Sequence, residues 1–367
     1  MLYLLSLFSD IDGLGILRVL DYISFRAAAA AVTAFFTVML LGPYTVRQLK
    51  RFRATAACRY EGLMPEEMIN REKDKTPSMG GLLIVGAIAI ATVLWAKMTN
   101  PIAVVLLATL LSFSALGFVD DYAKVAKQKR DGISAKTKLF GQCLTVLIGL
   151  LFLYAMPEQY GVPLTQFYVP FMKEPWFSSN FVLLFDMVVV IGASNAVNLT
   201  DGKDGLSSGC VIFAVGAYAV IAYLSGHVVF AKYLFIPHIP SAGEALVFSA
   251  AIVGSCAGFL WYNCFPASMF MGDTGSLALG GALGMLAVIV RQELLLAIIG
   301  GVFVMEAGSV MLQVPYFKLT HGKRLFRCTP IHHHFEYKGW KETQIVIRFW
   351  ILAGIFALIG LATLKLR

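Results

Sequence analysis

Charged residues are scarce in this chain. Only 14% of its 367 residues are Asp, Glu, Lys or Arg, whereas 58% are hydrophobic. Soluble proteins carry about 25% charged residues, so a fold built around one core in water is excluded. Apolar stretches such as residues 25–46 and 345–366 are long enough to cross a hydrocarbon layer about 30 Å thick. The sequence therefore predicts an integral membrane protein.

The chain also lacks paired cysteines and separate domains. No C-x-x-C pattern occurs, which argues against a disulfide framework or a zinc knuckle. The opening MLYLLSLF has no basic segment and is too short for a secretory signal, so we expect uncleaved insertion. Because no internal repeat or low-complexity linker divides the sequence, residues 1–367 are predicted to form a single polytopic membrane domain.

Hydropathy in windows of about 19 residues predicts an all-α fold with ten transmembrane helices. The predicted spans are residues 24–46, 80–97, 102–119, 138–156, 180–197, 206–225, 245–262, 275–291, 293–314 and 345–366. Two of these spans meet at Arg291-Gln292-Glu293, where we expect a tight turn at one membrane face. Closely spaced small residues in 272–284 and 300–309 predict close helix packing.

The placement of basic residues predicts the topology. Most of the 30 lysines and arginines lie in alternate loops. These loops, at residues 47–79, 120–137, 198–205, 263–274 and 315–344, are cytoplasmic by the positive-inside rule. Both termini then face the periplasmic or outer side. The net charge of +8 is explained by this topology, and no nucleic-acid partner is expected.

Two acidic motifs lie at the predicted cytoplasmic face. Asp120 and Asp121 end an apolar span, and neighbouring carboxylates suit a divalent cation or a shared proton. A solvated helix end is the alternative. Asp273 lies among glycines in FMGDTGS and is a candidate Mg²⁺ ligand, although it could simply be the N-cap of the next helix.

Two further motifs share this face. The segment NAVNLTDGKDGL (195–206) contains more Asn and Asp side chains than a turn requires. In PIHHHFE (330–336), consecutive histidines cannot all reach one metal, so phosphate binding or proton transfer is favoured over zinc. Lys73 or Lys75 could reach a phosphate or merely hold lipid headgroups. For the intramembrane acids Asp186 and Glu306 we expect structural roles.

Together these groups suit a Mg²⁺-dependent transfer from a water-soluble phosphate donor to a lipid acceptor. Taken together and in order, four of the motifs are specific enough to indicate a family. DDYAK, NAVNLTDGKDGL, FMGDTGS and PIHHHFE, in this order, resemble the phospho-N-acetylmuramoyl-pentapeptide-transferase family over nearly the whole chain, from TPSMGG at 76–81 onward. The wider polyprenyl-phosphate N-acetylhexosamine-1-phosphate transferase superfamily shares the acidic motifs, and the triple histidine favours the muramoyl-pentapeptide branch.

The resemblance implies a reaction and a cellular location. Phospho-MurNAc-pentapeptide would move from UDP-MurNAc-pentapeptide to undecaprenyl phosphate, giving lipid I and UMP in peptidoglycan synthesis. It also implies Mg²⁺ as cofactor, a homodimer of ten-helix protomers, and a bacterial inner membrane with the active site facing the cytoplasm.

The resemblance also implies residue roles. Asp120 and Asp121 would be the acidic pair, with Asp120 as the base acting on the lipid phosphate. Asp273 would be the catalytic Mg²⁺ ligand and His332 a catalytic or phosphate-positioning histidine. The residues implied to bind substrate are Lys73, Asn198, Asp201, Asn263, Phe270, Gln313, His333 and His334.

Two other functions remain open from the sequence. A secondary transporter also has many spans and intramembrane acids, but it would show interrupted helices near the midplane and an internal repeat. A sister transferase would attach N-acetylglucosamine-1-phosphate to the same lipid.

Overall fold

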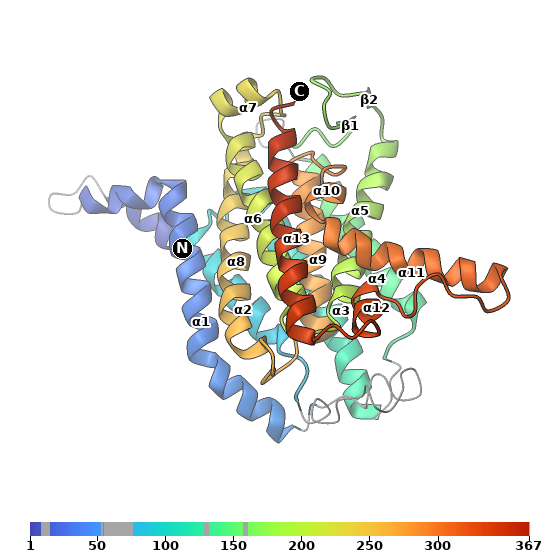
Figure 1. Ribbon diagram of the computed structural model, residues 1–367. Helices are drawn as coiled ribbons and strands as arrows, with labels where there is room; N and C mark the ends of the chain where they lie inside the picture. Colours follow the sequence, from blue (N-terminus) through green and yellow to red (C-terminus); the bar gives the residue numbers. More distant parts are fainter. Residues whose placement is uncertain (9–14, 53, 55–75, 128–131, 157–160, 367) are drawn as a thin grey trace.

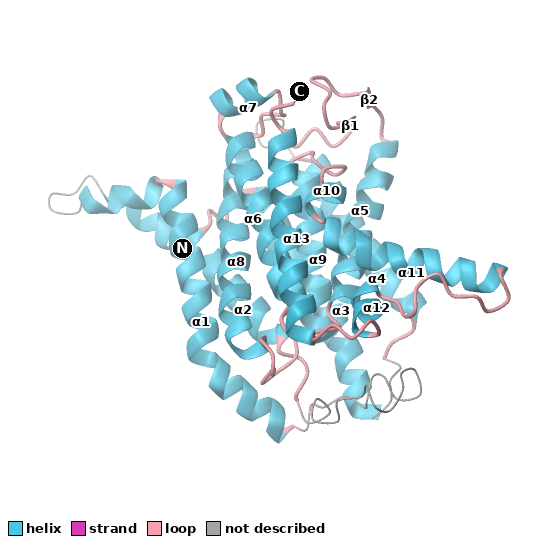
Figure 2. Ribbon diagram, in the orientation of Figure 1, coloured by secondary structure: helices cyan, strands magenta, loops and turns pink. Residues whose placement is uncertain are grey.

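The computed structural model describes residues 1–8, 15–52, 54, 76–127, 132–156 and 161–366. Helices make up almost all of the regular structure, and the two short strands pair as an antiparallel hairpin at one end (Figure 2). Among the described residues, eight helices are long and apolar enough to cross a membrane. The prediction of an all-α, multi-pass membrane protein is confirmed at this level.

The helices follow the predicted spans closely. The eight long helices are α1 (Ile23–Arg51), α3 (Pro101–Lys127), α4 (Ala135–Tyr154), α5 (Phe181–Thr200), α6 (Leu206–Gly226), α8 (Gly243–Asn263), α9 (Gly272–Ile289) and α13 (Glu342–Thr363). The predicted span 80–97 corresponds to the shorter apolar helix α2 (Gly81–Trp95).

The sequence predicts one continuous helix over residues 293–314, and the structure differs from this prediction. It is divided into α10 (Leu296–Ile299) and α11 (Gly301–Leu319), which meet at Gly300. Figure 1 shows α11 leaving the bundle at an angle to the other helices. Short elements complete the chain: η1 (Leu2–Phe8), η2 (Gly15–Asp21), β1 (Gln166–Phe167), β2 (Phe177–Ser178), α7 (Val228–Leu234), η5 (Pro240–Ala242) and α12 (Ile331–Glu336).

Helix α9 forms the centre of the bundle. It is 94% buried over its apolar window, and its glycines allow neighbouring backbones to approach closely. A Cβ atom at Gly280 would lie 2.6 Å from the carbonyl oxygen of Ala193 in α5, and one at Gly117 in α3 would overlap the carbonyl oxygen of Asp273. The predicted small-residue packing is therefore present, and it fixes the start of α9 against α3.

The turn between α9 and α10 is present, but its charged side chains are buried. Arg291 is fully buried and pairs with Asp186 at 2.9 Å and Glu293 at 2.7 Å. It also donates a 2.8 Å hydrogen bond to the carbonyl oxygen of Gln166 in β1. A buried cation needs such partners, so this network fastens the hairpin to the bundle and gives Asp186 the expected structural role.

Candidate active site

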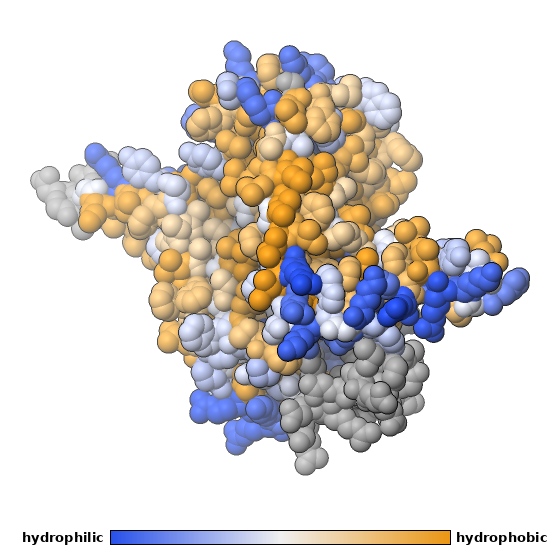
Figure 3. Space-filling model, viewed as in Figure 1, coloured by the Kyte–Doolittle hydropathy of each residue, from blue (hydrophilic) through white to orange (hydrophobic). Residues whose placement is uncertain are grey.

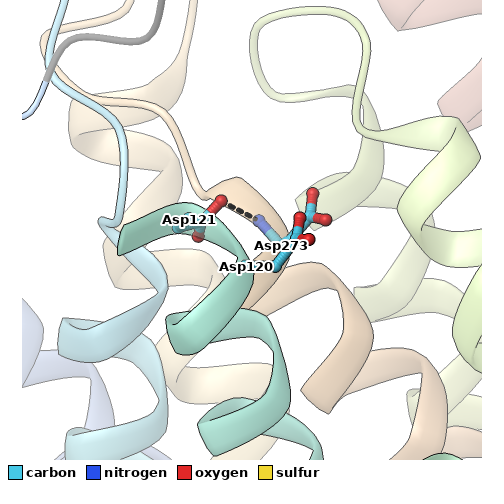
Figure 4. A group of neighbouring side chains, drawn as sticks. All are labelled: Asp120, Asp121 and Asp273. Atoms are coloured by element: carbon cyan, nitrogen blue, oxygen red, sulfur yellow. Dashed lines mark hydrogen bonds between the residues drawn. The ribbon is translucent and has the colours of Figure 1, made fainter. Parts of the chain in front are cut away.

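Three buried aspartates gather where α3 ends and α9 begins (Figure 4). Asp120, Asp121 and Asp273 each offer a carboxylate oxygen, and the three oxygens lie within 4.8 Å of one another. None of the three residues is more than 6% exposed. Carboxylates this close repel one another, so they require cations or hydrogen-bond donors nearby.

The Asp121 carboxylate accepts hydrogen bonds from the first residues of α9. Its Oδ1 accepts the amide N–H of Asp273 at 3.1 Å. Its Oδ2 accepts the amide and the hydroxyl of Thr274 at 2.9 and 2.7 Å. A negative charge at a helix N-terminus is stabilised by the unpaired N–H groups there. Gly272, at φ +74°, brings the chain so close that a Cβ atom would lie 2.6 Å from Asp121 Oδ2.

Asp120 and Asp273 are held by two lysines. Lys124 lies one turn after Asp120 and its Nζ is 2.6 Å from Asp120 Oδ2 and 3.1 Å from Asp273 Oδ2. Lys138 of α4 reaches Asp273 Oδ2 at 2.8 Å. The other oxygen of Asp120 accepts the N–H of Ile133 at 2.8 Å. Among the described residues, two ammonium groups therefore lie against this group of three carboxyl side chains.

The donor set of this cluster fits a hard divalent cation. Mg²⁺ prefers carboxylate oxygens, usually one or two, and takes water and substrate phosphate at its other positions. Asp120 and Asp273 could supply those oxygens, because the Oδ2 atom of each already contacts a cationic group, Lys124 or Lys138. Asp121 fits less well, since its oxygens accept hydrogen bonds from the backbone and the Thr274 hydroxyl of α9 and contact no lysine among the described residues.

Asn198 connects α5 to the acidic cluster. Its side-chain amide donates to Asp273 Oδ1 at 2.9 Å and to the Ser276 hydroxyl at 2.8 Å. Because Asn198 lies in the last turn of α5, the following loop begins beside the aspartates. The surplus of amide side chains in this motif therefore has a specific contact in the fold.

A fully buried histidine lies on the other side of this loop. His332 is the second residue of α12, and its Nδ1 lies 2.9 Å from Glu306 Oε2. A Cβ atom at position 202 would overlap His332 Nε2, so Gly202 allows the ring to reach the α5–α6 loop. Since Asn198 and Gly202 are four residues apart, the end of α5 and the loop that follows it border both the acidic cluster and the histidine.

Glu306 lies within the predicted span, in α11, and is buried. Its contact with His332 of α12 agrees with the structural role expected for it, a hydrogen bond to a neighbouring helix. Gln313 in turn holds the loop after α11: its Oε1 accepts the N–H groups of Leu325 and Phe326 at 2.9 and 3.0 Å.

His333 and His334 have different surroundings. His333 is buried, and its Nδ1 lies 3.1 Å from Glu336 Oε2; Lys203 pairs with the same carboxylate at 2.6 Å. Burial lowers the pKa of His333 to about 4. Burial would raise the pKa of Glu336, but the His333 hydrogen bond and the Lys203 charge outweigh it and lower that pKa to about 2. His334 instead accepts the N–H of Arg327 at its Nδ1.

A cavity of about 400 Å³ opens beside these histidines. Its walls come from the end of α5, from α11 and from the loop between α11 and α12, and they combine three cations with His332 and His333. Cationic side chains with several donors suit phosphate or carboxylate groups. The lining residues are Leu199, Gly202, Gln313, Val314, Phe317, Lys318, Arg324, Arg327, Cys328, Thr329, Pro330, His332 and His333.

The remaining candidates lie in the connecting loops or, for Asn263, at the end of α8. Asn263 is buried, accepts the Gly205 N–H at 3.1 Å and donates to the Met269 carbonyl at 3.0 Å, so it joins two loops. Asp201 follows the last residue of α5. The backbone N–H of Phe270 donates to the carbonyl of Pro77, and its ring is half-buried. Lys73 lies outside the described residues. The substrate contacts of this group stay predictions.

Comparison with known proteins gives the family. The model of glycosyl transferase family 4 matches residues 102–291. Proteins named phospho-N-acetylmuramoyl-pentapeptide-transferase match over the full length. That of Desulfotalea psychrophila is 48% identical over 355 residues, covering 95% of this chain and 96% of the relative. That of Thermodesulfovibrio yellowstonii is 46% identical over 364 residues, covering 98% and 99%. At these identities over nearly complete lengths, the chain belongs to the phospho-N-acetylmuramoyl-pentapeptide-transferase family.

Proposed function

We propose that this protein transfers phospho-MurNAc-pentapeptide from UDP-MurNAc-pentapeptide to undecaprenyl phosphate, forming lipid I and UMP. One observation carries the proposal beyond family membership: a single segment, residues 198–202 at the end of α5 and the start of the following loop, borders both a buried carboxylate cluster and a histidine beside a cationic cavity. Phosphoryl transfer is mainly positioning and charge stabilisation, and this arrangement offers cations for phosphates beside carboxylates for a metal or a proton.

The reaction forms one phosphorus–oxygen bond and breaks another. An oxygen of the lipid phosphate attacks the sugar-linked phosphorus of the donor, and the bond to the UMP phosphate breaks. We assign Asp120 as the group that accepts a proton from the lipid phosphate. Its neighbour Asp121 already accepts three hydrogen bonds from α9, so Asp121 is assigned to holding α9 in place.

The metal proposed for this site is Mg²⁺, held by Asp273, which leaves Asp120 to accept the proton. When bound, it would neutralise the charge on the donor pyrophosphate. Lys124 and Lys138 would be near enough to bind phosphate oxygens of the substrates, and Asn198 holds Asp273 in its orientation. His332, fixed by Glu306, is proposed to position a phosphate of the donor from the opposite side of the 198–202 segment.

The proposed setting is a bacterial inner membrane, with ten spans, both termini outside and the active site facing the cytoplasm. Support comes from the basic residues in loops 47–79, 120–137, 198–205, 263–274 and 315–344. Further support is that the aspartate cluster and His332 lie in or beside these same loops. We count α2 and the α10–α11 pair as the ninth and tenth spans. A homodimer is proposed from the family alone.

A donor and acceptor panel tests the function. Purified protein is incubated with UDP-MurNAc-pentapeptide or UDP-N-acetylglucosamine, with and without undecaprenyl phosphate and Mg²⁺, and released UMP is measured. We expect UMP only from the muramoyl donor with lipid and Mg²⁺ both present. Release from UDP-N-acetylglucosamine would indicate the sister transferase instead, and no release under any condition would contradict a transferase.

A further inference from the structure

A second cavity, of about 330 Å³, lies on the other side of α12 from the cationic cavity. Ile331 and Phe335, one helical turn apart on α12, form part of its wall, whereas His332 and His333 line the cationic cavity. The second cavity is open on one side and is bordered by α11, α12, the turn after α12 and the first half of α13. Its lining residues are Met305, Ile331, Phe335, Trp340, Arg348, Phe349, Ile351 and Leu352.

Seven of these eight side chains are apolar, and the aromatic ones form a continuous floor. Phe335 stacks on Trp340 with ring centroids 4.5 Å apart, and Phe349 meets Phe335 edge-on at 6.0 Å. A lining of this kind offers few hydrogen bonds to a water-soluble ligand, and it suits a hydrocarbon chain.

Arg348 is the single charged group of the lining. Its guanidinium lies 4.1 Å from the Trp340 ring centroid, and it makes no ion pair with any residue that the structure describes. Lys338 lies nearby, 5.8 Å from the Phe335 ring. Arg348 is exposed at an apolar cavity and has no carboxylate partner in the described part of the chain, so it has the charge to receive an anion.

The position along α13 places this cation close to a membrane surface. Arg348 is six residues after the start of the helix at Glu342, which is about 9 Å along its axis. Its neighbours Ile347 and Ile351 are 54% and 57% exposed. In Figure 3 the hydrophobic surface of α13 is interrupted by a hydrophilic patch at its lower end, near α12. Arginines at this depth extend to the headgroup layer.

We propose that the cavity between α11, α12 and α13 binds an anionic phospholipid, with part of an acyl chain on the aromatic floor and the phosphate on Arg348. The acceptor lipid is a poorer occupant, because its phosphate must reach Asp120 and Asp273, and α12 separates this cavity from the cationic one. Since Ile331 and Phe335 belong to the helix that carries His332, a bound lipid would also support that helix.

Brominated lipids test the proposal through Trp340, which lies in the cavity wall. The full chain is placed in nanodiscs containing equal mole fractions of either brominated phosphatidylglycerol or brominated phosphatidylcholine. Quenching of Trp340 is obtained by subtracting the signal of Trp340→Phe. We expect about fivefold preference for the anionic lipid, the contribution of one basic residue near a membrane surface.

Two variants distinguish lipid binding at this cavity from a general attraction between anionic lipid and basic residues. Arg348→Gln should remove the preference. Lys365→Gln should retain it, because Lys365 lies at the other end of α13, with its ammonium 3.5 Å from the Tyr233 ring. Equal quenching by both lipids, or equal loss in both variants, would overturn the proposal. Displacement of the brominated lipid by a stoichiometric amount of undecaprenyl phosphate would overturn it too, since the occupant would then be the acceptor. The measurement does not depend on transferase activity.

Discussion

The Glu306–His332 pair gives the sharpest quantitative prediction. Both side chains are fully buried, and Glu306 Oε2 lies 2.9 Å from His332 Nδ1. A hydrogen bond to a charged group contributes about 1.5–3 kcal/mol, which corresponds to roughly a 10- to 150-fold change in rate when it acts on the transition state. We expect Glu306→Ala to lower kcat by the upper part of that range. Glu306→Gln can still accept through its carbonyl oxygen, so it should lose about tenfold.

The assay is steady-state UMP release with both substrates varied. A positioning role predicts a loss in kcat, recovery in Glu306→Gln relative to Glu306→Ala, and little change in the KM of the lipid. Glu293→Gln serves as a control, because Glu293 is equally buried in the Arg291 network at the opposite end of the bundle. If Glu306→Ala and Glu293→Gln lost activity and melting temperature in parallel, Glu306 would be only structural and the reasoning would be refuted.

Further predictions concern the same site. Asp120→Asn should lower turnover at least a hundredfold with little change in melting temperature. Asp121→Asn should instead lower stability by about 1–2 kcal/mol, because it weakens the hydrogen bonds to the start of α9. The reverse pattern in turnover and thermal melts would exchange the two roles. Gly202→Ala should lower kcat, because the added Cβ would displace His332; an unchanged kcat would mean that the ring position does not matter. The pKa of His333 is lowered to about 4 in the folded protein, whereas an unfolded histidine has a pKa of about 6.5. Between these values the unfolded chain binds a proton that the folded chain does not, so stability should fall as the pH drops from about 6.5 towards 4. Thermal melts of His333→Gln should show a smaller fall, and an identical fall would contradict the buried neutral ring.

The helices could be predicted largely from the sequence, because a membrane helix must satisfy its backbone internally and cover itself with apolar side chains. Window hydropathy therefore located the eight long helices and α2. It could not give the direction of α11, since hydropathy measures apolar content along the chain and contains no angle. The break at Gly300 and the departure of α11 from the bundle depend on packing against α13 and α5.

The candidate site was predictable in part for a related reason. Acidic and amide side chains at a membrane boundary are costly to desolvate, so their clustering marked the 120–121, 198 and 273 positions. Sequence alone could not separate the two adjacent aspartates, because which carboxylate meets the start of α9 depends on how α3 is rotated. Lys138 was missed as well, since its contact with Asp273 joins residues 135 positions apart.

The most direct test of the account follows the transferred group itself. Donor labelled in the muramoyl-pentapeptide is mixed with undecaprenyl phosphate, Mg²⁺ and excess enzyme, and label extracted into butanol is compared with UMP formed. For the unmodified protein we predict equal amounts of lipid-linked label and UMP. In Asp273→Asn and His332→Ala we predict that the rate of transfer falls at least a hundredfold, although both variants remain folded. Near-normal transfer in both variants would remove the aspartate cluster and the histidine from the active site.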